Sequence, residues 1–189
     1  MIALIDNYDS FTFNIYDYLI KFTDIRVFRN TDPIDGLRAL KPRGIVISPG
    51  PSHPRNSLLS LDAITCYKGK VPILGICLGM QAIAYESGST VRKARRIMHG
   101  KVDTIENSGG LLFKGIGATF PAVRYHSLVV NNDNERFHVC AVSQSDGEIM
   151  AIEDTDLKLF GLQFHPESYA THHGITFIEN FVEVCNGNA

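Results

Sequence analysis

A cysteine stands between two glycines in the segment Gly75-Ile76-Cys77-Leu78-Gly79, where a short apolar run meets the start of a helical pattern. Small residues around a nucleophile permit a tight strand-to-helix turn, and the helix N-terminus behind it supplies free N–H groups and the positive end of the helix dipole. There the thiolate of Cys77, which is the reactive form of a cysteine, is favoured. The segment predicts a nucleophilic cysteine, although a buried cysteine that ends a core strand has the same local pattern.

A cysteine nucleophile needs a base and a group that orients the base, and the sequence offers His165 and Glu167. Of the seven histidines, only His165 directly follows an apolar run and has a carboxylate two residues later. Pro166 between them keeps the preceding residue extended, so that Glu167 can orient the imidazole. A metal site that adds His172 and His173 to this pair is the alternative. Its spacing matches no zinc motif, and we expect no metal here.

A third feature is the loop Ser48-Pro49-Gly50-Pro51-Ser52, which directly follows the apolar run 45–47. Two prolines around a glycine make a rigid loop whose N–H groups can point at a developing oxyanion. An ordinary strand-ending turn has the same composition. Taken together, a nucleophile, a base with its orienting carboxylate and an N–H loop form the set that acyl transfer through a thioester requires.

The first half of the chain alternates short apolar runs with helical patterns. We predict strands over residues 2–5, 25–28, 44–47 and 71–76, and helices over residues 11–22, 34–40, 58–67 and 78–85. Ser10 is expected to cap the first helix, and Pro33 marks the start of the second. Such strand–helix units are typical of a parallel sheet covered on both faces. The predicted fold class is α/β, flavodoxin-like and doubly wound, with a mostly parallel central sheet.

From about Val91 the pattern changes to short β-like runs. We predict added antiparallel or mixed strands over residues 124–131, 137–142, 149–152 and 159–164, and a final helix over residues 175–184. Open α/β sheets bind ligands beyond the carboxyl ends of their strands. The loops after residues 5, 47, 76 and 164 are therefore expected to meet, which would bring Cys77 and His165 together.

Length, charge and cysteine content limit the class of protein. At 189 residues, with 44% hydrophobic and 20% charged residues, the chain is predicted to be a single globular domain, residues 1–189. A net charge of −2 gives no basic field, so we expect neither nucleic acid nor a membrane as a partner. The four cysteines are too dispersed for a disulfide framework. Without a signal-peptide pattern or an apolar window of about 18 residues, the sequence predicts a cytoplasmic location.

Six motifs occur along the chain: Asp6-Asn7-Tyr8-Asp9-Ser10-Phe11-Thr12, Ser48-Pro49-Gly50-Pro51, Gly75-Ile76-Cys77-Leu78-Gly79-Met80-Gln81, Ile97-Met98-His99-Gly100-Lys101, Arg124-Tyr125-His126-Ser127-Leu128 and Phe164-His165-Pro166-Glu167-Ser168. In this order they resemble the class I, triad-type glutamine amidotransferases over nearly the whole chain. More narrowly, they resemble the glutaminase subunit shared by anthranilate synthase and aminodeoxychorismate synthase. Six motifs in order are far more specific than any one of them.

The resemblance implies that Cys77 attacks the side-chain amide of L-glutamine, with His165 as general base and acid and Glu167 as the residue that orients it. A glutamyl thioester forms, ammonia leaves, and water activated by His165 releases glutamate. No cofactor is required. The resemblance further implies a set of glutamine-binding residues, in which N–H groups of Leu78 and the Gly50 loop hold the oxyanion and the others hold the two ends of glutamine: Gly50, Pro51, Ser52, Leu78, Gln81, Ser127 and Leu128.

Ammonia would then pass, within a hetero-oligomer, to a chorismate-binding synthase subunit, in the first place anthranilate synthase component I. The folate pathway, with aminodeoxychorismate synthase as partner, is the alternative within the family. A free-standing Cys-His hydrolase and a non-catalytic interaction module are alternatives outside it. Both leave the glutamine-binding motifs unexplained.

Four segments carry features that this resemblance does not explain. Ser52 stands where the family usually has glycine, so a positive φ there would cost stability or alter the loop. Residues 168–174 differ from the usual family pattern, and we expect them to change a surface near the site. Residues 7–12 either form turn and cap interactions or bind a partner, and the basic run 92–96 is either a solvated strand face or a contact for an acidic patch of the synthase.

Overall fold

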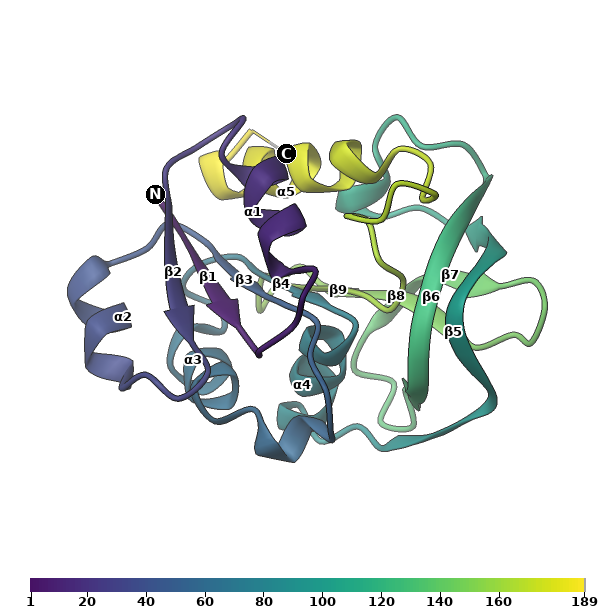
Figure 1. Cartoon of the computed structure of the whole chain (residues 1–189), viewed down its shortest axis with the longest axis horizontal. Helices are drawn as coiled ribbons and strands as arrows, with labels where there is room; N and C mark the ends of the chain where they lie inside the picture. Colours follow the sequence, from purple (N-terminus) through teal and green to yellow (C-terminus); the bar gives the residue numbers. More distant parts are fainter. Residues whose placement is uncertain (189) are drawn as a thin grey trace.

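Five parallel strands form one side of a nine-stranded sheet in the computed structural model of the chain, which describes residues 1–188 (Figure 1). They lie in the order β2-β1-β3-β4-β9, which is the strand order of flavodoxin-like folds. This confirms the predicted fold class. Their bounds are β1 (Ile2–Asp6), β2 (Ile25–Arg29), β3 (Ile45–Ile47), β4 (Ile73–Ile76) and β9 (Leu159–Leu162).

Four strands extend the sheet beyond β9 in antiparallel pairing, in the order β8-β7-β5-β6. They are β8 (Ile149–Asp154), β7 (His138–Ser143), β5 (Val91–Asn107) and β6 (Thr119–Val130). The β5–β6 pair stands at the side of the molecule away from β2 (Figure 1). The predicted antiparallel additions are therefore present, with one difference. Residues 159–164, predicted as one of the added strands, contain β9, which pairs parallel with β4 and antiparallel with β8.

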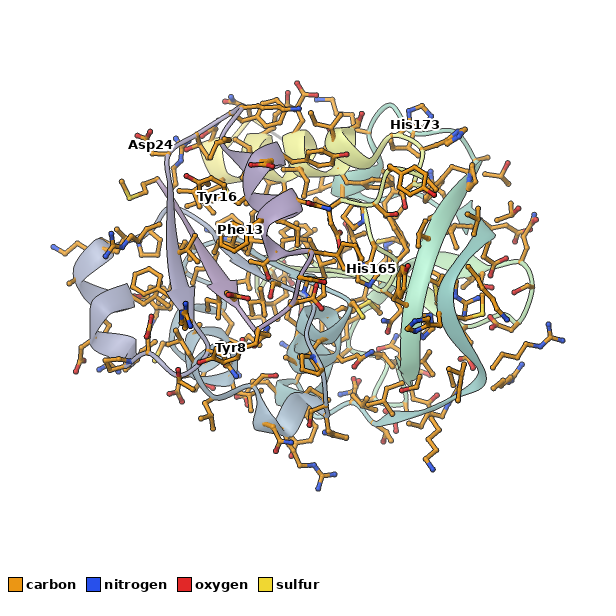
Figure 2. The ribbon with its side chains drawn as sticks, viewed as in Figure 1. Tyr8, Phe13, Tyr16, Asp24, His165 and His173 are labelled. Atoms are coloured by element: carbon orange, nitrogen blue, oxygen red, sulfur yellow. The ribbon has the colours of Figure 1, made fainter. Side chains whose placement is uncertain are left out.

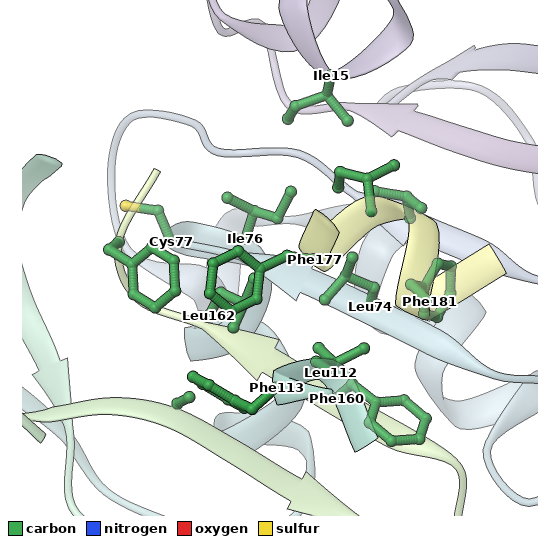
Figure 3. Packing of buried hydrophobic residues seen from close by; sticks show 14 of the residues in the cluster. Ile15, Leu74, Ile76, Cys77, Leu112, Phe113, Phe160, Leu162, Phe177 and Phe181 are labelled. Carbon is green, nitrogen blue, oxygen red and sulfur yellow. The ribbon is translucent and has the colours of Figure 1, made fainter. Parts of the chain in front are cut away.

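Helices cover both faces of the parallel strands (Figure 1). One face carries α1 (Thr12–Leu19) and α5 (Gly174–Asn186), and the other carries α2 (Ile34–Leu40), α3 (Leu58–Tyr67) and α4 (Leu78–Glu86). Successive residues of β1 alternate between the two hydrophobic cores that result, with Ile2 and Leu4 in the first and Ala3 and Ile5 in the second. Figure 3 shows part of the first core, where Phe177 and Phe181 of α5 lie with side chains of β4 and β9.

The predicted and observed elements differ most around the start of α1 and along β5. Ser10 does not cap α1, because the N-cap residue is Phe11, which makes no side-chain capping hydrogen bond. Instead Asp6 Oδ1 accepts hydrogen bonds from the Tyr8 and Asp9 N–H groups and from Thr12 Oγ1, at 2.9, 3.3 and 2.9 Å. These are turn and cap interactions, one of the two interpretations of residues 7–12.

Strand β5 was not predicted as one element because two register shifts, at 93–98 and 99–101, interrupt its alternation of buried and exposed residues. Strand β6 begins at Thr119, earlier than predicted, and contains Pro121. Proline is tolerated there because β6 is an edge strand. No helix within residues 1–188 is long and apolar enough to cross a membrane.

Candidate active site

Cys77 lies on a sharp turn between β4 and α4, with φ 52° and ψ −103°. Non-glycine residues adopt such a conformation only where their surroundings hold them there. Close packing of backbone provides this: a Cβ on Gly75 would lie 2.3 Å from the Gly79 carbonyl carbon, and one on Gly79 would lie 2.4 Å from Ile47 O. The Cys77 N–H also donates to Leu162 O at 2.7 Å. The two glycines of the motif are therefore what allows the turn.

His165 follows β9 and is held from both sides of its backbone. Its N–H donates to Val123 O at 2.9 Å, and its carbonyl accepts from Thr171 Oγ1 at 2.6 Å. In Figure 2 it lies next to β6, the strand to which Val123 belongs. Its ring Nδ1 lies 2.6 Å from Glu167 Oε1, and both side chains are buried. Since a carboxylate can only accept, Nδ1 carries the hydrogen when the ring is neutral, and Nε2 then has the lone pair that can accept a proton.

The surroundings of His165 favour its charged form. Burial alone would lower the pKa of His165, but the Glu167 carboxylate and the neighbouring Cys77 raise it well above its ordinary value. The Nε2 atom is buried and has no hydrogen-bond partner within residues 1–188. The Cys77 thiol points at Tyr125 O, with a sulfur–oxygen distance of 3.6 Å. A cysteine beside a histidine with this charge preference is the arrangement that transfers a thiol proton to an imidazole.

Cys77 lines two cavities at once. A cavity of about 150 Å³ contains six of the seven predicted glutamine-binding residues, namely Gly50, Pro51, Ser52, Gln81, Ser127 and Leu128. A second cavity of about 430 Å³ is lined by Cys77 and His165 with Tyr8, His99 and Tyr125. The first is smaller than the roughly 300–1,000 Å³ typical of sites for drug-sized ligands. It therefore suits a single amino acid.

Leu78 is the predicted residue that lines neither of these cavities with its side chain. It is the first residue of α4, so its N–H has no acceptor within the helix. The arrangement thus leaves a backbone donor directly after Cys77. Gln81 is buried, and its Nε2 donates to Leu128 O at 3.0 Å and to Gln163 Oε1 at 3.1 Å.

Asn7 fastens the proline–glycine loop to the end of β1. The Asn7 N–H donates to Ser48 Oγ at 2.9 Å, and its Nδ2 donates to Ser48 O at 3.0 Å. Ser52 in this loop has φ 77°, the left-handed conformation that favours glycine. Its Oγ accepts a hydrogen bond from Asn56 Nδ2 at 2.8 Å. Serine is thus tolerated in a conformation that favours glycine.

Three aromatic side chains around His165 received no role from the sequence. Phe11 and Tyr125 lie edge-on to the His165 ring, with ring centroids 5.8 and 5.5 Å away, and His99 lies 5.2 Å from Tyr125. All three line the larger cavity. Each belongs to one of the quoted motifs, which was the available signal, but residue type alone assigns no function to it.

A fully buried arginine lies behind the smaller cavity and was also missed. Arg124 contacts the Asp103 carboxylate, and its Nη2 donates to Asp146 Oδ2 at 2.9 Å. Its Nε donates to His126 Nε2 at 3.0 Å, so the hydrogen of His126 is on Nδ1, which donates to Leu128 O at 3.1 Å. Burial and the Arg124 guanidinium lower the pKa of His126 to about 4. The neutral histidine thus connects the buried ion pairs to the cavity wall.

Residues 3–185 match the family described as glutamine amidotransferase class-I. The chain belongs to this family. It is 44% identical to anthranilate synthase component 2 of Lactococcus lactis, over 100% of this chain and 96% of that protein. It is 45% identical to aminodeoxychorismate synthase component 2 of Escherichia coli, over 96% of this chain and 99% of that protein. A protein of Bacillus subtilis that is 44% identical, over 97% of this chain and 96% of that one, is named for both activities.

The fold of this glutamine amidotransferase is also found among solved structures. A protein of Thermoplasma acidophilum described as part of GMP synthase has a TM-score of 0.87 and 25% identity, over 98% of this chain and 94% of that one. A glutamine amidotransferase of Thermotoga maritima has a TM-score of 0.72 and 16% identity, over 98% and 82% of the two chains. The second likeness concerns the fold alone.

The segments 168–174 and 92–96 of the amidotransferase, for which the sequence left the role open, both carry exposed side chains. His172 and His173 are exposed beyond the His165 loop, and Tyr169 is 99% exposed. In the basic run 92–96, Arg92 forms a bidentate pair with Glu148, at 3.0 and 2.6 Å, whereas Lys93, Arg95 and Arg96 are exposed. The Arg95 Nη1 atom also donates to Asp146 O at 3.1 Å. The run is therefore a strand face with two cations held by the neighbouring β7–β8 turn.

Proposed function

We propose that this chain is the glutaminase subunit of a chorismate-using synthase: it hydrolyses L-glutamine through a thioester on Cys77 and delivers ammonia to a separate synthase subunit. The observation that carries the proposal is the position of Cys77, on a strained turn between an amino-acid-sized cavity and a larger one. Family membership gives the reaction class, and the geometry supports the assignment of roles to residues.

The proposed reaction starts with glutamine in the smaller cavity, held by Gln81 and by the backbone at Ser127 and Leu128. The Cys77 thiol gives its proton to His165 Nε2, and the sulfur attacks the side-chain amide carbon. N–H groups of Leu78 and of the loop around Gly50 stabilise the oxyanion. The carbon–nitrogen bond breaks, ammonia leaves with the proton from His165, and a thioester remains.

Water then completes the turnover. His165 takes a proton from the water, the resulting hydroxide attacks the thioester carbon, and the carbon–sulfur bond breaks to give glutamate and the free thiol. Glu167 fixes the ring orientation and stabilises the imidazolium in both steps. Ammonia and glutamate carry all the atoms of glutamine and water, so neither a redox partner nor a cofactor is needed.

The partner in this proposal is the chorismate-binding component I of the synthase. Its support is the names of the relatives, which are component 2 proteins of such enzymes. The larger cavity, with half-exposed Tyr8 at its wall, offers a route for ammonia that differs from the glutamine pocket. We propose anthranilate synthase, and hence tryptophan synthesis, as the first assignment, and aminodeoxychorismate synthase, and hence folate synthesis, as the alternative.

Replacing the nucleophile tests the catalytic proposal. We expect Cys77→Ser to abolish glutamine-dependent product formation by the reconstituted complex and to leave ammonia-dependent synthesis intact, because the partner's own site is untouched. Cys66→Ser, a half-buried thiol on α3, is the matched control and should keep both activities. Glutamine-dependent synthesis at the normal rate in Cys77→Ser would refute the role of Cys77. Reconstitution with each synthase subunit in turn, followed by assay of anthranilate and aminodeoxychorismate, separates the two pathways.

A further inference from the structure

Three side chains of metal-binding type converge on β7 and β8, far from the proposed glutaminase site. His138 and Cys140 belong to β7, and Glu153 of β8 is the residue directly opposite His138 in the strand pairing. One ligand atom of each lies within 4.8 Å of the others. A register shift between residues 139 and 141 makes Cys140 the extra residue of a bulge. Bulges of this kind redirect side chains and often occur beside functional sites.

The site lies at the opposite end of the sheet from Cys77. Strand β7 runs in the same direction as β9 and β4, since β7 and β8, and β8 and β9, pair antiparallel and β9 and β4 pair parallel. His138 is the first residue of β7, whereas Cys77 follows the last residue of β4. The three side chains are therefore not part of the machinery proposed above, and an inference about them is independent of it.

The two distances from His138 Nδ1 to the other ligand atoms match a tetrahedral zinc site, and Cys140 Sγ lies within 4.8 Å of the Glu153 carboxylate. Cys140 Sγ lies 3.5 Å from His138 Nδ1, and His138 Nδ1 lies 3.5 Å from Glu153 Oε1. Zinc–sulfur bonds of about 2.3 Å and zinc–nitrogen or zinc–oxygen bonds of about 2.0–2.1 Å, at tetrahedral angles, place neighbouring ligand atoms roughly 3.3–3.6 Å apart. An ion between these atoms needs little rearrangement of the side chains.

The loop at Gly110 and Leu111 fixes the orientation of the Glu153 carboxylate, as is common for metal ligands. The Leu111 N–H donates to Glu153 Oε2 at 3.0 Å, which leaves Oε1 toward His138. Gly110 covers the group so closely that a Cβ there would lie 2.8 Å from Cys140 Sγ and 2.9 Å from Glu153 Oε2. Hydrogen bonds to ligating groups from a second layer are a regular feature of metal sites.

The opposite side of the cluster is open. His138 and Glu153 line a cavity of about 410 Å³ together with Arg136, Asp154 and Asp156. A water molecule from this cavity can complete four-coordination, as in zinc sites with three protein ligands. One thiolate and one carboxylate would neutralise a divalent ion, and the thiol proton would pass to solvent on binding.

We propose that His138, Cys140 and Glu153 bind one Zn²⁺ ion, with water as the fourth ligand. No sequence motif marks this site, because two of its ligands are separated by one residue and the third comes from the next strand. Thiolate together with imidazole favours zinc over magnesium or calcium, which prefer oxygen ligands.

Cobalt binding tests the site directly, because Co²⁺ occupies zinc sites and a thiolate ligand gives it a charge-transfer absorption. The chelator-treated Cys77→Ser chain, which lacks the catalytic thiol, should bind one equivalent of Co²⁺ with this band, and Zn²⁺ should displace it. Cys140→Ser should abolish the band. His138→Ala and Glu153→Gln should each weaken Zn²⁺ affinity by about tenfold or more, since loss of even a supporting group costs that much.

The controls separate ligation from general damage. Cys66→Ser and His172→Ala remove a half-buried thiol and an exposed imidazole elsewhere and should change nothing. The His138 side chain is 59% exposed, so His138→Ala should fold even if Cys140→Ser does not. Absence of cobalt binding, a thiolate band that survives in Cys140→Ser, or unchanged Zn²⁺ affinity in His138→Ala would each overturn the proposal. The three side chains would then be an ordinary ion pair beside a core thiol.

Discussion

Cys77 and Ser52 are both part of the candidate site and both have a positive φ angle, for different reasons. Cys77 is held at φ 52° by the packing of Gly75 and Gly79 and by its hydrogen bond to Leu162. Ser52, at φ 77°, is exposed and has a single side-chain hydrogen bond, to Asn56. The first conformation presents the proposed nucleophile, whereas the second only shapes a loop. A glycine at position 52 should therefore relieve the backbone strain without affecting the proposed chemistry, which is not the case for a substitution at position 77.

We expect Ser52→Gly to raise the free energy of unfolding by about 0.5–1 kcal/mol. Glycine relieves left-handed strain of roughly 1–3 kcal/mol, and the loss of an exposed hydrogen bond and the greater freedom of glycine in the unfolded chain offset part of this gain. Urea unfolding of both proteins measures the difference. A less stable variant would mean that the Ser52–Asn56 hydrogen bond outweighs the backbone strain.

The sequence predicts those residues of the candidate site that directly follow apolar strands. Cys77, His165 and the loop at Gly50 each come directly after a buried run, and strand ends meet at one edge of a parallel sheet. Arg124 and Asp146 could not be found in this way. Arg124 belongs to β6 and Asp146 to the turn between β7 and β8. The order of these strands in the sheet is not readable from local pattern, and charged residues are normally assigned to the surface.

At the scale of helices and strands, the contact between α4 and β3 sets the direction of α4, the helix that follows Cys77. Gly79 lies in the first turn of α4 and faces the Ile47 carbonyl. Backbone contacts this close are possible only without a side chain. Placement of the N-terminal turn of α4, and with it the Leu78 N–H, depends on this contact.

Gly79→Ala is therefore expected to lower the free energy of unfolding by about 2 kcal/mol or more, although alanine's better helix propensity contributes about 1 kcal/mol in the opposite direction. The rigid backbone oxygen 2.4 Å from the new Cβ cannot rotate away. Gly117→Ala is the control, because its Cβ would meet only Thr119 O at 3.7 Å. Equal stability of the two variants, measured by chemical denaturation, would contradict the importance of the α4–β3 contact.

The element boundaries were predictable where one periodicity holds from end to end. The predicted helix 58–67 coincides with α3, and the short parallel strands were located to within a few residues. Strand β5 was missed because its bulges shift the alternation twice and most of its residues are exposed. Pairing with β6 and β7, which is a tertiary interaction, stabilises it in place of a continuous apolar face.

For the molecule as a whole, the buried neutral His126 makes global stability depend on pH. Its pKa of about 4 in the native state compares with about 6.5 in the unfolded chain. Between these values the unfolded chain binds the proton and the native protein does not, so stability falls as the pH falls through this window. The pKa of His165 is raised, so its stabilising effect is lost only above the unfolded value and does not offset this loss.

We expect His126→Asn to reduce the loss of unfolding free energy between about pH 7 and about pH 4.5 by roughly 2–3 kcal/mol. Asparagine cannot gain a proton, and its amide can still donate to Leu128 O. Urea unfolding at both pH values gives the difference, and carboxylate titration affects both proteins alike. His172→Asn, at an exposed position, should retain the original pH dependence. An unchanged profile in His126→Asn would show that His126 titrates normally in the native protein.

The pairing of β4 with β9 has a consequence for the synthesis of the protein. Cys77 follows β4 in the middle of the chain, whereas His165 follows β9 near its end. A ribosome-bound chain can assemble β2, β1, β3 and β4 first, but the edge of β4 stays unpaired until β9 emerges. Unpaired edges of apolar strands promote association between chains. The proposed pair of Cys77 and His165 therefore cannot form until the last third of the chain has been translated, and until then the chain is most prone to aggregation.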